Sequence, residues 1–549
     1  MWRSADFSIK VAGKSCRECS NRSNSPRRTM GDQQSRELEL QSHAAIELVF
    51  EGADAPPCRV AVPATVYPPR EDTELLDAAL AELGIRPEAR LLEIGCGCGA
   101  AAIAAALRGM RVVACDVNPL AVAASRGNAA RAGVEERVDV VEAGIGEDGS
   151  WPDGVAGPFD VICWNTPYLD GGESGETSEV TGSGSLGPLE DAGLLDLAGE
   201  SGWTGMLLAA LVARPDVLAE GGVVLLVHAD TERGELAQTR WRRKGFATRT
   251  LACARLDGDE RLTAFAAWTP WGGRAPEWAE KVDSTNTRLL SSGAGAGERL
   301  FTKSQTEGRG QRDRNWLMRP GDFAGSWALD PLDGQQPDGV GDLQLKAALA
   351  AAEAISCTLE LPLPSTHWTH AAALSERGVA VHWPNDIWLP SGKAAGCLVE
   401  GRQQGEQNSI VLGIGVNLPE GAGEQHEFPL SGLSELEGFT CDLKEFSRYL
   451  DASVASLFER HPMIPDTSTA RIRRSLWALM TQWLADGRCC RSGAEPWGRP
   501  AGLGGDGSLR VASATGIVEC REVAGLEWSS HQESSSTAAE MSSSTSEGS

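Results

Sequence analysis

Three glycines and one acidic residue have the spacing that a nucleotide-like ligand requires. Gly95, Gly97 and Gly99 directly follow the apolar run LLEI and open an Ala-rich stretch. A glycine loop between a strand and a helix brings backbone N–H groups close to a ligand. About twenty residues further on, Asp116 ends a β-branched run, where a carboxylate can accept two ribose hydroxyls. These residues predict a site for a dinucleotide or for S-adenosylmethionine.

A tetrad, Asn165-Thr166-Pro167-Tyr168, follows the apolar run FDVICW. If that run is a strand, the tetrad lies at the carboxyl edge of the sheet, beside the glycine loop. The oxygen of Asn165 and a backbone carbonyl can accept both hydrogens of a planar NH2 group, while the ring of Tyr168 stacks on its face. This pattern predicts methyl transfer to an amide or amino nitrogen, by positioning and polarisation without a general base. The alternative is a turn that only caps the strand.

A loop rich in arginine predicts a second site. Arg309, Arg312 and Arg314 share it with Gly308 and Gly310. Guanidinium groups bind phosphate oxygens in pairs, and glycine leaves backbone N–H groups exposed, so the loop is suited to a polyphosphate. The alternative is a solvated basic loop.

Lys393 follows Asn385 and Asp386 within one short stretch further along the chain. This order places a mobile ammonium group beside a potential pair of metal–phosphate ligands. The stretch GIGVN at 413–417 comes next.

Alternating β-branched runs and Ala-rich stretches must position the first site. This alternation predicts an α/β doubly wound sheet, which a further helical stretch, LLAALVARPDVLAEGG, and the strand VVLLVHA extend. The second region is mixed α and β, and a short β-rich stretch follows it. The concentration of Gly and Pro in TPWGGRAPE, at 269–277, predicts the main domain boundary.

Length and charge limit the function classes. At roughly 150 residues per domain, 549 residues predict three or four domains. The net charge of −26 repels phosphate backbones and argues against nucleic acid as a general partner. No run is long and apolar enough for a bilayer, so we expect no membrane association and a cytoplasmic protein. Residues 1–30 are rich in Arg and Ser, which suits either a transit peptide or an extension before a true start at Met30.

The cysteines do not predict a metal centre. The chain has 14, but only Cys16 and Cys19 form a C-x-x-C pair, and no second pair follows at zinc-finger distance. We therefore expect buried, reduced thiols and no metal site.

The first half resembles the release-factor glutamine methyltransferases, a class I family that uses S-adenosylmethionine. The resemblance rests on VYPPREDTELL at 66–76, EIGCGCG at 93–99 and NTPY at 165–168. It implies a Rossmann-like domain that holds the methyl donor with Glu93, Gly95, Gly97, Gly99 and Asp116, and the acceptor with Asn165, Thr166, Pro167 and Tyr168. Two residues depart from the family pattern: Thr166 replaces a proline, and Gly144 stands where an acidic residue usually lies near the adenine.

The second half resembles the biotin protein ligases in the order and spacing of five blocks, at 282–286, 305–316, 382–389, 393–400 and 413–417. The resemblance implies an α+β catalytic domain that makes biotinyl-5'-AMP from biotin and ATP with Mg, and then biotinylates a lysine of a carboxylase carrier domain. The implied catalytic residues are Lys393 and Arg309. The implied substrate-binding residues are Ser284, Thr285, Asn286, Gln305, Gly308, Arg309, Gly310, Arg312, Arg314, Trp316, Asn385, Asp386 and Asn417.

Two further features qualify the ligase resemblance. The lipoate ligases share the fold, but their Arg-Arg and Gly-Gly-Gly phosphate-binding block is absent from this sequence. Biotin is therefore favoured over lipoate as the expected substrate. His382 replaces a lysine of the family, and Asp313 stands in the phosphate loop where glycine is common.

We therefore expect a bifunctional enzyme: a biotin–[biotin carboxyl-carrier protein] ligase joined to an S-adenosylmethionine-dependent N-methyltransferase, whose acceptor is a protein glutamine, for instance in a release factor. The alternatives for the first half are a nucleic-acid adenine methyltransferase and an inactive docking module. The expected parts are a disordered extension at 1–40, a methyltransferase domain at 41–268, a linker at 269–277, a ligase domain at 278–480, a small β domain at 485–528 and a disordered Ser-rich tail at 529–549.

Overall fold

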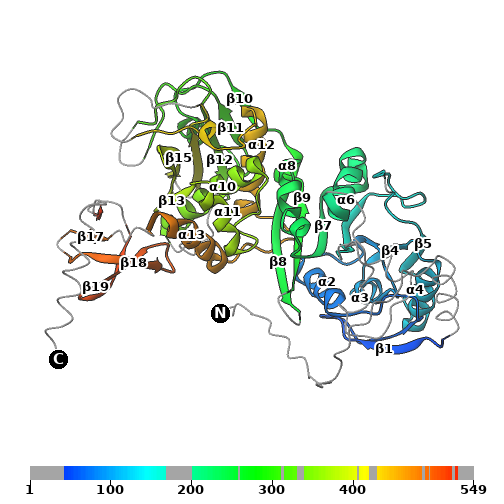
Figure 1. The fold of residues 1–549 in the computed structure, drawn as a ribbon. Helices are drawn as coiled ribbons and strands as arrows, with labels where there is room; N and C mark the ends of the chain where they lie inside the picture. Colours follow the sequence, from blue (N-terminus) through cyan, green and yellow to red (C-terminus); the bar gives the residue numbers. More distant parts are fainter. Residues whose placement is uncertain are drawn as a thin grey trace, which may run out of the picture. The chain divides into compact units, whose positions relative to one another are not determined.

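The computed structural model describes part of the 549-residue chain (Figure 1). The described residues are 43–146, 148–168, 201–256, 260–310, 315–330, 339–404, 407–419, 429–484, 489–493, 495–521 and 526–528. The predictions of a disordered extension at 1–40 and of a disordered tail at 529–549 therefore lie outside them. So do Arg312, Arg314, Asp313 and the Cys16–Cys19 pair.

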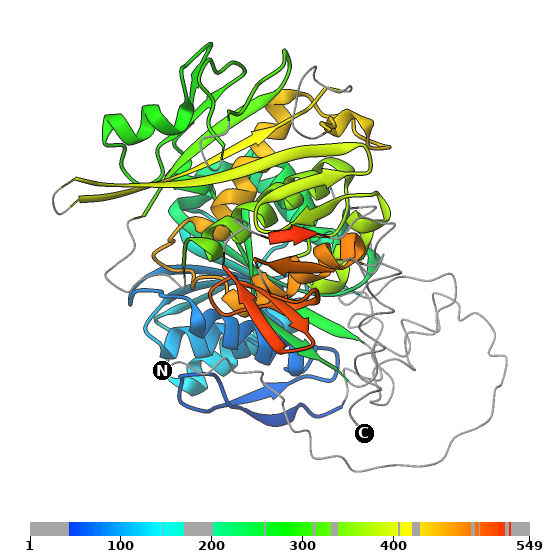
Figure 2. The same ribbon diagram turned by 90° about the vertical axis from the view of Figure 1, so that its left-hand side faces the viewer.

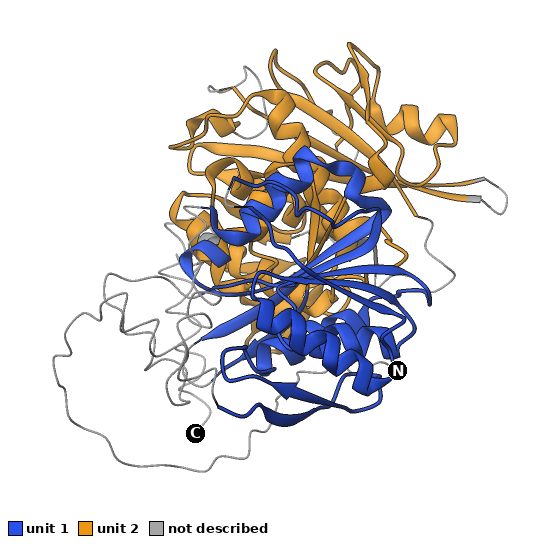
Figure 3. Ribbon diagram, turned by 90° about the vertical axis from the view of Figure 1, so that its right-hand side faces the viewer, with its two compact units in different colours: residues 1–234, 251–265 blue, residues 235–250, 266–549 orange. Residues whose placement is uncertain are grey.

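The described residues form two compact units (Figure 3). The first contains residues 1–234 and 251–265, and the second contains residues 235–250 and 266–549. The bounds differ from those expected from the sequence, because residues 235–250 and the stretch after 265 pack with the second unit. The predicted linker includes a turn, η4 (Pro270–Gly273), in which Trp271 and Gly272 have left-handed backbone with φ of +56° and +63°, and Trp271 is buried.

A seven-stranded sheet in the order β5-β4-β3-β6-β7-β9-β8 lies mainly in the first unit, and the first residues of β8 and the last of β9 belong to the second. The pairs β5–β4, β4–β3, β3–β6 and β6–β7 are parallel, as the alternation of strands and helices predicted. Its strands are β3 (Arg90–Ile94), β4 (Arg111–Asp116), β5 (Val138–Glu142), β6 (Phe159–Asn165), β7 (Leu218–Ala229), β8 (Ala247–Arg255) and β9 (Arg261–Trp268). A separate antiparallel hairpin consists of β1 (Ile46–Phe50) and β2 (Cys58–Val62).

Helices connect these strands: α2 (Glu71–Glu82), α3 (Ala100–Leu107), α4 (Pro119–Ala132), α6 (Gly202–Ala213), η3 (Pro215–Val217), α7 (Glu232–Glu235) and α8 (Ala237–Arg243). Helix α4 begins where Asn118 Oδ1 accepts a hydrogen bond from Leu120 N, at 2.9 Å, and it ends at Gly133 with φ of +70°. The stretch LLAALVARPDVLAEGG is helical only in its first part. Helix α6 stops before Pro215, which disfavours helical backbone at the preceding residue, and β7 already begins at Leu218.

A second seven-stranded sheet, in the order β10-β11-β12-β16-β15-β14-β13, lies in the second unit. Its strands are β10 (Glu277–Ala279), β11 (Arg299–Thr302), β12 (Phe323–Leu329), β13 (Ala380–His382), β14 (Asp386–Leu389), β15 (Gly392–Gln404) and β16 (Gln407–Val416). All neighbours are antiparallel except β10 and β11. The long β15–β16 hairpin is conspicuous in Figure 2.

The helical segments of this unit are α9 (Thr285–Ser292), α10 (Gly339–Leu359), η6 (Trp368–His370), α11 (Ala371–Glu376), η7 (Leu433–Glu435), α12 (Leu443–Phe458) and α13 (Thr469–Leu484). The middle of α10 is rich in buried alanine, which allows close packing against α12. The C-terminal part forms a five-stranded antiparallel sheet from β17 (Cys490–Ser492), β18 (Gly498–Leu503), β19 (Leu509–Ser513), β20 (Gly516–Cys520) and β21 (Leu526–Trp528).

An ion pair inside the second unit ties helix α8 to helix α10. Arg242 pairs with Glu353, and their side chains are 1% and 0% exposed. Arg242 Nε also donates to Thr248 Oγ1, at 2.9 Å, and Glu353 Oε1 accepts from Ser365 N, at 2.7 Å. Both charges are thus paired and hydrogen-bonded, the condition under which a protein interior tolerates them.

Glu353→Ala should lower the free energy of unfolding of the second unit by about 3–5 kcal/mol, because it leaves the buried Arg242 charge without a partner. Calorimetry of the full chain, with the transition assigned by the shift that biotin and ATP cause, measures this loss. Glu277→Ala, at an exposed residue of the same unit, is the control. An equal effect of the two substitutions would contradict the assigned role of the pair.

Candidate active sites

The glycine loop of the first unit has left-handed backbone at all three of its glycines. Gly95, Gly97 and Gly99 have φ of +68°, +53° and +81°, values in the left-handed region that favours glycine. The loop is fixed to β4, since Gly95 N donates to Cys115 O at 2.8 Å and Gly97 N donates to Asp116 Oδ2 at 2.9 Å. The loop and the end of β4 therefore form one rigid edge.

Asp116 uses both carboxylate oxygens to hold the backbone at this edge. Oδ2 accepts from Gly97 N and Oδ1 accepts from Asn118 N, each at 2.9 Å. Burial raises the pKa of Asp116, and these backbone N–H groups oppose the rise. Each carboxylate oxygen has a second lone pair, so Asp116 can still accept hydrogen bonds from ribose hydroxyls.

Glu93 is a buried carboxyl group at the end of β3. Its pKa is raised from 4.5 to about 8, chiefly by burial; a hydrogen bond from the backbone of Ala102 opposes the rise, and the charges of Asp116 and Asp77 add to it. Its Oε2 atom has no hydrogen-bond partner among the described residues. A buried, unsatisfied acceptor is costly without a ligand and suits a site that binds a cationic donor.

Without ligand, the first unit should lose stability as the pH rises from about 4.5 to about 8. The pKa of Glu93 is 4.5 when exposed and about 8 when folded. The folded protein therefore binds the extra proton, and the stability that this proton contributes is lost as the pH rises through the folded pKa. Thermal unfolding at several pH values measures the loss, and Glu93→Gln should flatten the profile in this window. A profile that Glu93→Gln leaves unchanged would assign the effect to another group.

The Asn-Thr-Pro-Tyr tetrad begins at the last residue of β6, at the carboxyl edge of the sheet. Asn165 Oδ1 is buried and has no hydrogen-bond partner among the described residues. Tyr168 Oη donates to Asp72 Oδ2 at 3.3 Å, and Tyr67 Oη donates to the same oxygen at 3.1 Å. Burial first, and then the Asp72 charge, raises the pKa of both phenols, so they remain donors. The tetrad thus presents a vacant acceptor beside an oriented aromatic ring.

Thr166 keeps the tetrad rigid by a different means from the proline that it replaces. Both its N–H group and its hydroxyl donate to Val227 O, at 3.0 and 2.8 Å. A proline has no N–H group and could make neither bond. Two hydrogen bonds to β7 therefore hold the chain at this position.

Gly144 leaves no room for a side chain in the present arrangement. A Cβ atom there would lie 2.5 Å from Cγ1 of Val117, the residue after Asp116. Val117 is 71% exposed. Next to Gly144 the protein therefore presents the apolar side chain of Val117, where the family usually has an acidic residue.

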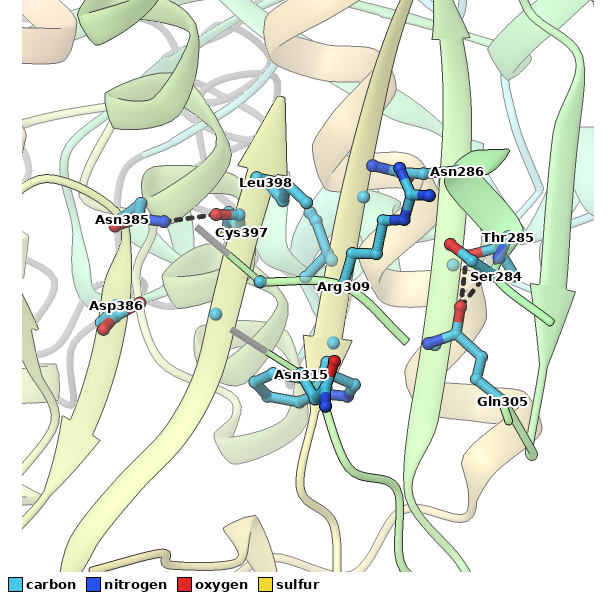
Figure 4. Close-up of a pocket in the computed structure, with 18 of the residues that line it drawn as sticks. Ser284, Thr285, Asn286, Gln305, Arg309, Asn315, Asn385, Asp386, Cys397 and Leu398 are labelled. Atoms are coloured by element: carbon cyan, nitrogen blue, oxygen red, sulfur yellow. Dashed lines mark hydrogen bonds between the residues drawn. The ribbon is translucent and has the colours of Figure 1, made fainter. Parts of the chain in front are cut away.

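A cavity in the second unit brings together most of the predicted ligase residues (Figure 4). In the view of Figure 4, Ser284, Thr285 and Gln305 lie at one end, and Asn385 and Asp386 lie at the other. The predicted residues that line it are Ser284, Thr285, Asn286, Gln305, Arg309, Gly310, Trp316, Asn385, Asp386 and Lys393. Gly308 and Asn417 do not line the cavity, but their backbone or side chain forms hydrogen bonds with the lining residues Trp316 and Lys393.

At the first end of the cavity, hydrogen bonds fix the polar side chains. Ser284 Oγ begins helix α9 by accepting from Thr287 N at 3.4 Å. Gln305 Oε1 accepts from Thr285 N at 2.8 Å and contacts Thr285 Oγ1 at 3.1 Å. Since its oxygen is used in this way, Gln305 has its NH2 group left for a ligand carbonyl.

At the other end, Lys393 is the main cation. Its Nζ atom lies 2.8 Å from Asp386 Oδ2 and 5.8 Å from the centroid of the Trp316 ring. Its side chain is only 13% exposed. Asn417 Nδ2 donates to Lys393 O at 3.0 Å, so Asn417 positions the lysine through its backbone. Asn385 donates to the backbone oxygen of Cys397.

Backbone contacts close the base of the phosphate loop. Trp316 N donates to Gly308 O at 2.8 Å, and Arg309 forms an antiparallel bridge with Asn315. A Cβ atom on Gly308 would overlap the Trp316 oxygen, which explains the glycine there. His382, which replaces a lysine, stacks on Trp388 with the ring centroids 4.5 Å apart.

Known families match both halves of the chain. The model of the biotin/lipoate A/B protein ligase family matches residues 278–417, and that of the ribosomal protein L11 methyltransferases matches residues 73–166. Biotin–[acetyl-CoA-carboxylase] ligase of Paracoccus denitrificans is 31% identical over 44% of this chain and 97% of its own length. Release factor glutamine methyltransferase of Salmonella typhimurium is 32% identical over 37% of this chain and 67% of its own.

The chain belongs to both the biotin protein ligases and the release factor glutamine methyltransferases. This membership confirms the predicted fusion of two enzymes. Among solved structures, biotin protein ligase from Aquifex aeolicus in complex with biotin and ATP is similar, with 22% identity, a TM-score of 0.37, and coverage of 47% of this chain and 99% of its own. The chain spans 55% of release factor glutamine methyltransferase of Chlorobaculum tepidum and 67% of that of Salmonella typhimurium.

Sequence patterns did not identify every residue that shapes the two sites. Tyr67 and Asp72 lie within the quoted segment at 66–76, but the pattern gave no reason to place them beside Tyr168. Ser326, which contacts Thr285 and Asn286, was not identified, because its partners lie far away in the sequence. The same holds for Glu400, which contacts Asn286 and Arg309. The described residues contain no cluster of His, Cys, Asp and Glu suited to a metal ion. Among the described helices, none has both the length and the apolarity to cross a bilayer.

Proposed function

We propose that the second unit activates biotin with ATP and transfers it to a lysine of a carboxylase carrier domain. The observation that carries this proposal is one cavity with polar ring-binding groups at one end and Lys393 beside Asp386 at the other. A neutral, bicyclic urea such as biotin's needs hydrogen-bond donors and acceptors, and its carboxylate needs a cation. Ser284 and Gln305 supply the first requirement, and Lys393 supplies the second.

In the first step, an oxygen of the biotin carboxylate attacks the α-phosphorus of ATP, and the bond to the β-phosphate breaks to release pyrophosphate. Lys393 neutralises the charge that the two anions bring together. Asn385 and Asp386, beside Lys393, would hold the Mg²⁺ of MgATP, and the ion would supply further neutralisation of phosphate charge. In the second step, the carrier lysine attacks the acyl carbon and AMP leaves.

Arg309 lies at the base of the phosphate loop, where its side chain is 58% exposed. Its guanidinium group can form charge-assisted hydrogen bonds with the phosphate of the adenylate. We propose that this contact retains the intermediate until the carrier lysine arrives, and that Arg312 and Arg314 contribute similarly.

Incubation of the purified chain with biotin, MgATP and a carrier domain tests the ligase proposal. The expected product is a carrier with one biotinylated lysine, identified by mass spectrometry. Lipoate in place of biotin is the matched control, since both acids are activated on the same fold. If lipoate is transferred and biotin is not, the substrate assignment fails.

We further propose that the first unit methylates the side-chain amide of a protein glutamine, with a release factor as its partner. The oxygen of Asn165, which has no hydrogen-bond partner among the described residues, supports this proposal, because a buried acceptor at the sheet edge can bind an amide N–H group. Glu93, Asp116 and the glycine loop would hold S-adenosylmethionine, which supplies an electrophilic methyl group. Asn165 orients the nitrogen, and Tyr168, fixed by Asp72, packs on the amide plane.

Mass spectrometry of a release factor after incubation with the chain and S-adenosylmethionine tests this second proposal. A methylated glutamine is the expected product. Methylation of adenine in nucleic acid instead would favour the first alternative. Failure to bind S-adenosylmethionine in calorimetry would favour an inactive docking module.

A further inference from the structure

A carboxylate beside the cavity contacts two parts of the ligase site. They are the ring-binding end, where Asn286 lies with Ser284 and Gln305, and the phosphate loop, which begins near Arg309. Glu400 lies on β15, and its side chain is 24% exposed. Its Oε2 atom accepts a hydrogen bond from Asn286 Nδ2 at 2.8 Å. Its Oε1 atom lies 3.6 Å from Arg309 Nη1. One side chain thus joins a residue of the ring-binding end to a residue of the phosphate loop.

The sheet register places Glu400 next to the ring-binding end of the cavity. Leu398, which lines the cavity, pairs with Gly413, and Glu400 lies two residues further along β15 on the same face. The amide of Asn286 packs against Gly413, where an added Cβ atom would overlap it. Asn286 is buried and therefore has little freedom to turn away from Glu400.

Glu400 also sets the direction of the hydrogen bonds around Asn286. An ionised carboxylate only accepts, so the NH2 group of Asn286 must face Glu400 and its oxygen must face the other way. That oxygen accepts from Ser326 Oγ at 2.6 Å. Ser326 Oγ also lies 2.7 Å from Thr285 Oγ1, so this hydroxyl contacts both side chains. The charge on Glu400 thus fixes which way the amide of Asn286 faces.

The contact with Arg309 is of another kind. A separation of 3.6 Å is an ion-pair distance rather than a hydrogen-bond distance, so the guanidinium group keeps its N–H groups for phosphate. The Arg309–Asn315 bridge fixes the backbone of Arg309, and the charge on Glu400 attracts its mobile end.

We propose that Glu400 is a positioning residue of the ligase, which orients Asn286 for biotin and keeps the Arg309 side chain over the adenylate. This inference rests on the proposed ligase function and adds a residue to it. It predicts that the two effects can be separated, because glutamine preserves one contact and removes the other.

Two variants of the full chain separate the effects. Glu400→Gln can still accept from Asn286 but has no charge for Arg309. It should release adenylate about fivefold faster, as expected for a half-exposed ion pair, and leave the KM for biotin within about twofold. Glu400→Leu removes both contacts and should also raise the KM for biotin about tenfold, since a buried amide loses its partner. Glu277→Gln, on the exposed edge strand β10, is the control.

The experiment traps released adenylate with a free amine and measures the KM for biotin in parallel. In an Arg309→Gly background, Glu400→Gln should cause no further release. Equal release from the wild type and Glu400→Gln, or additive effects of the two substitutions, would overturn the inference while leaving the ligase function intact. If the wild-type chain forms no adenylate at all, the proposed function fails, and the inference with it.

Discussion

Lys393→Ala should reduce the rate of biotinyl-adenylate formation by about a thousandfold, the upper range for the loss of one preorganised donor at a developing charge. Formation of the mixed anhydride brings a carboxylate and the α-phosphate together, and Lys393 is the main cation between them. The ammonium group is already positioned, since Asp386 Oδ2 lies at 2.8 Å and Asn417 holds the lysine backbone. Pyrophosphate release from biotin and ATP measures this step.

The control for this substitution is Lys303→Ala, at an exposed lysine of the same unit that pairs with Glu280. It should leave adenylate formation unchanged. Lys393→Arg keeps the charge but not the compact shape of the ammonium group, and we expect an intermediate rate. If Lys393→Ala forms adenylate at the wild-type rate but fails to biotinylate the carrier, the lysine acts in the second step and our assignment is wrong.

Asn165→Ala should lower methyl transfer by at least about a hundredfold and leave the affinity for S-adenosylmethionine within a few-fold. The reason is that the oxygen of Asn165, which no other described residue contacts by a hydrogen bond, is assigned to the methyl acceptor, whereas Asp116 and the glycine loop are assigned to the donor. Single-turnover methylation measures the first quantity, and calorimetry with the donor measures the second.

Asp116→Ala is the matched comparison for Asn165→Ala, because it should do the reverse and weaken donor binding first. Its loss also frees Gly97 N and Asn118 N, so the glycine loop should become less ordered. If Asn165→Ala loses the donor as severely as Asp116→Ala, the separation of the two roles would be refuted.

Contiguous motifs explain why much of each site could be predicted. The glycine loop, Asp116 and the tetrad each follow a strand directly, and the carboxyl ends of parallel strands meet at one edge. The same reasoning predicted the parallel sheet of the first unit. In the second unit, the stretches with Ser284, Gln305 and Lys393 lie far apart in the sequence, and the family resemblance, rather than any local pattern, brought them together.

The residues that orient the catalytic groups could not be predicted, because their roles depend on long-range contacts. Asp72 accepts hydrogen bonds from both Tyr67 and Tyr168. Glu400 accepts a hydrogen bond from Asn286 and forms an ion pair with Arg309. Periodicity reports which face of an element is buried, but it does not report which polar side chains meet across elements.

The extent of the second unit was also beyond prediction from patterns. Residues 235–250 follow the strand–helix alternation of the first unit, yet Arg242 and Thr248 are tied to Glu353 and Ser456. Gly and Pro at 269–277 suggested a linker, but Trp271 is buried and its Nε1 atom donates to Asp451 Oδ1 at 3.0 Å. Composition predicts a turn at this position, whereas only the packing shows what the turn contacts.

The central claim is that one chain carries both chemistries. It is tested most directly by incubating a single full-length preparation with ATP, biotin, S-adenosylmethionine, a carboxylase carrier domain and a release factor, and by analysing both proteins by mass spectrometry. We predict a biotinylated lysine on the carrier and a methylated glutamine on the release factor, with Lys393→Ala removing only the first and Asn165→Ala only the second. A carrier that stays unmodified with the wild-type chain, or one substitution that removes both products from a folded chain, would contradict the account.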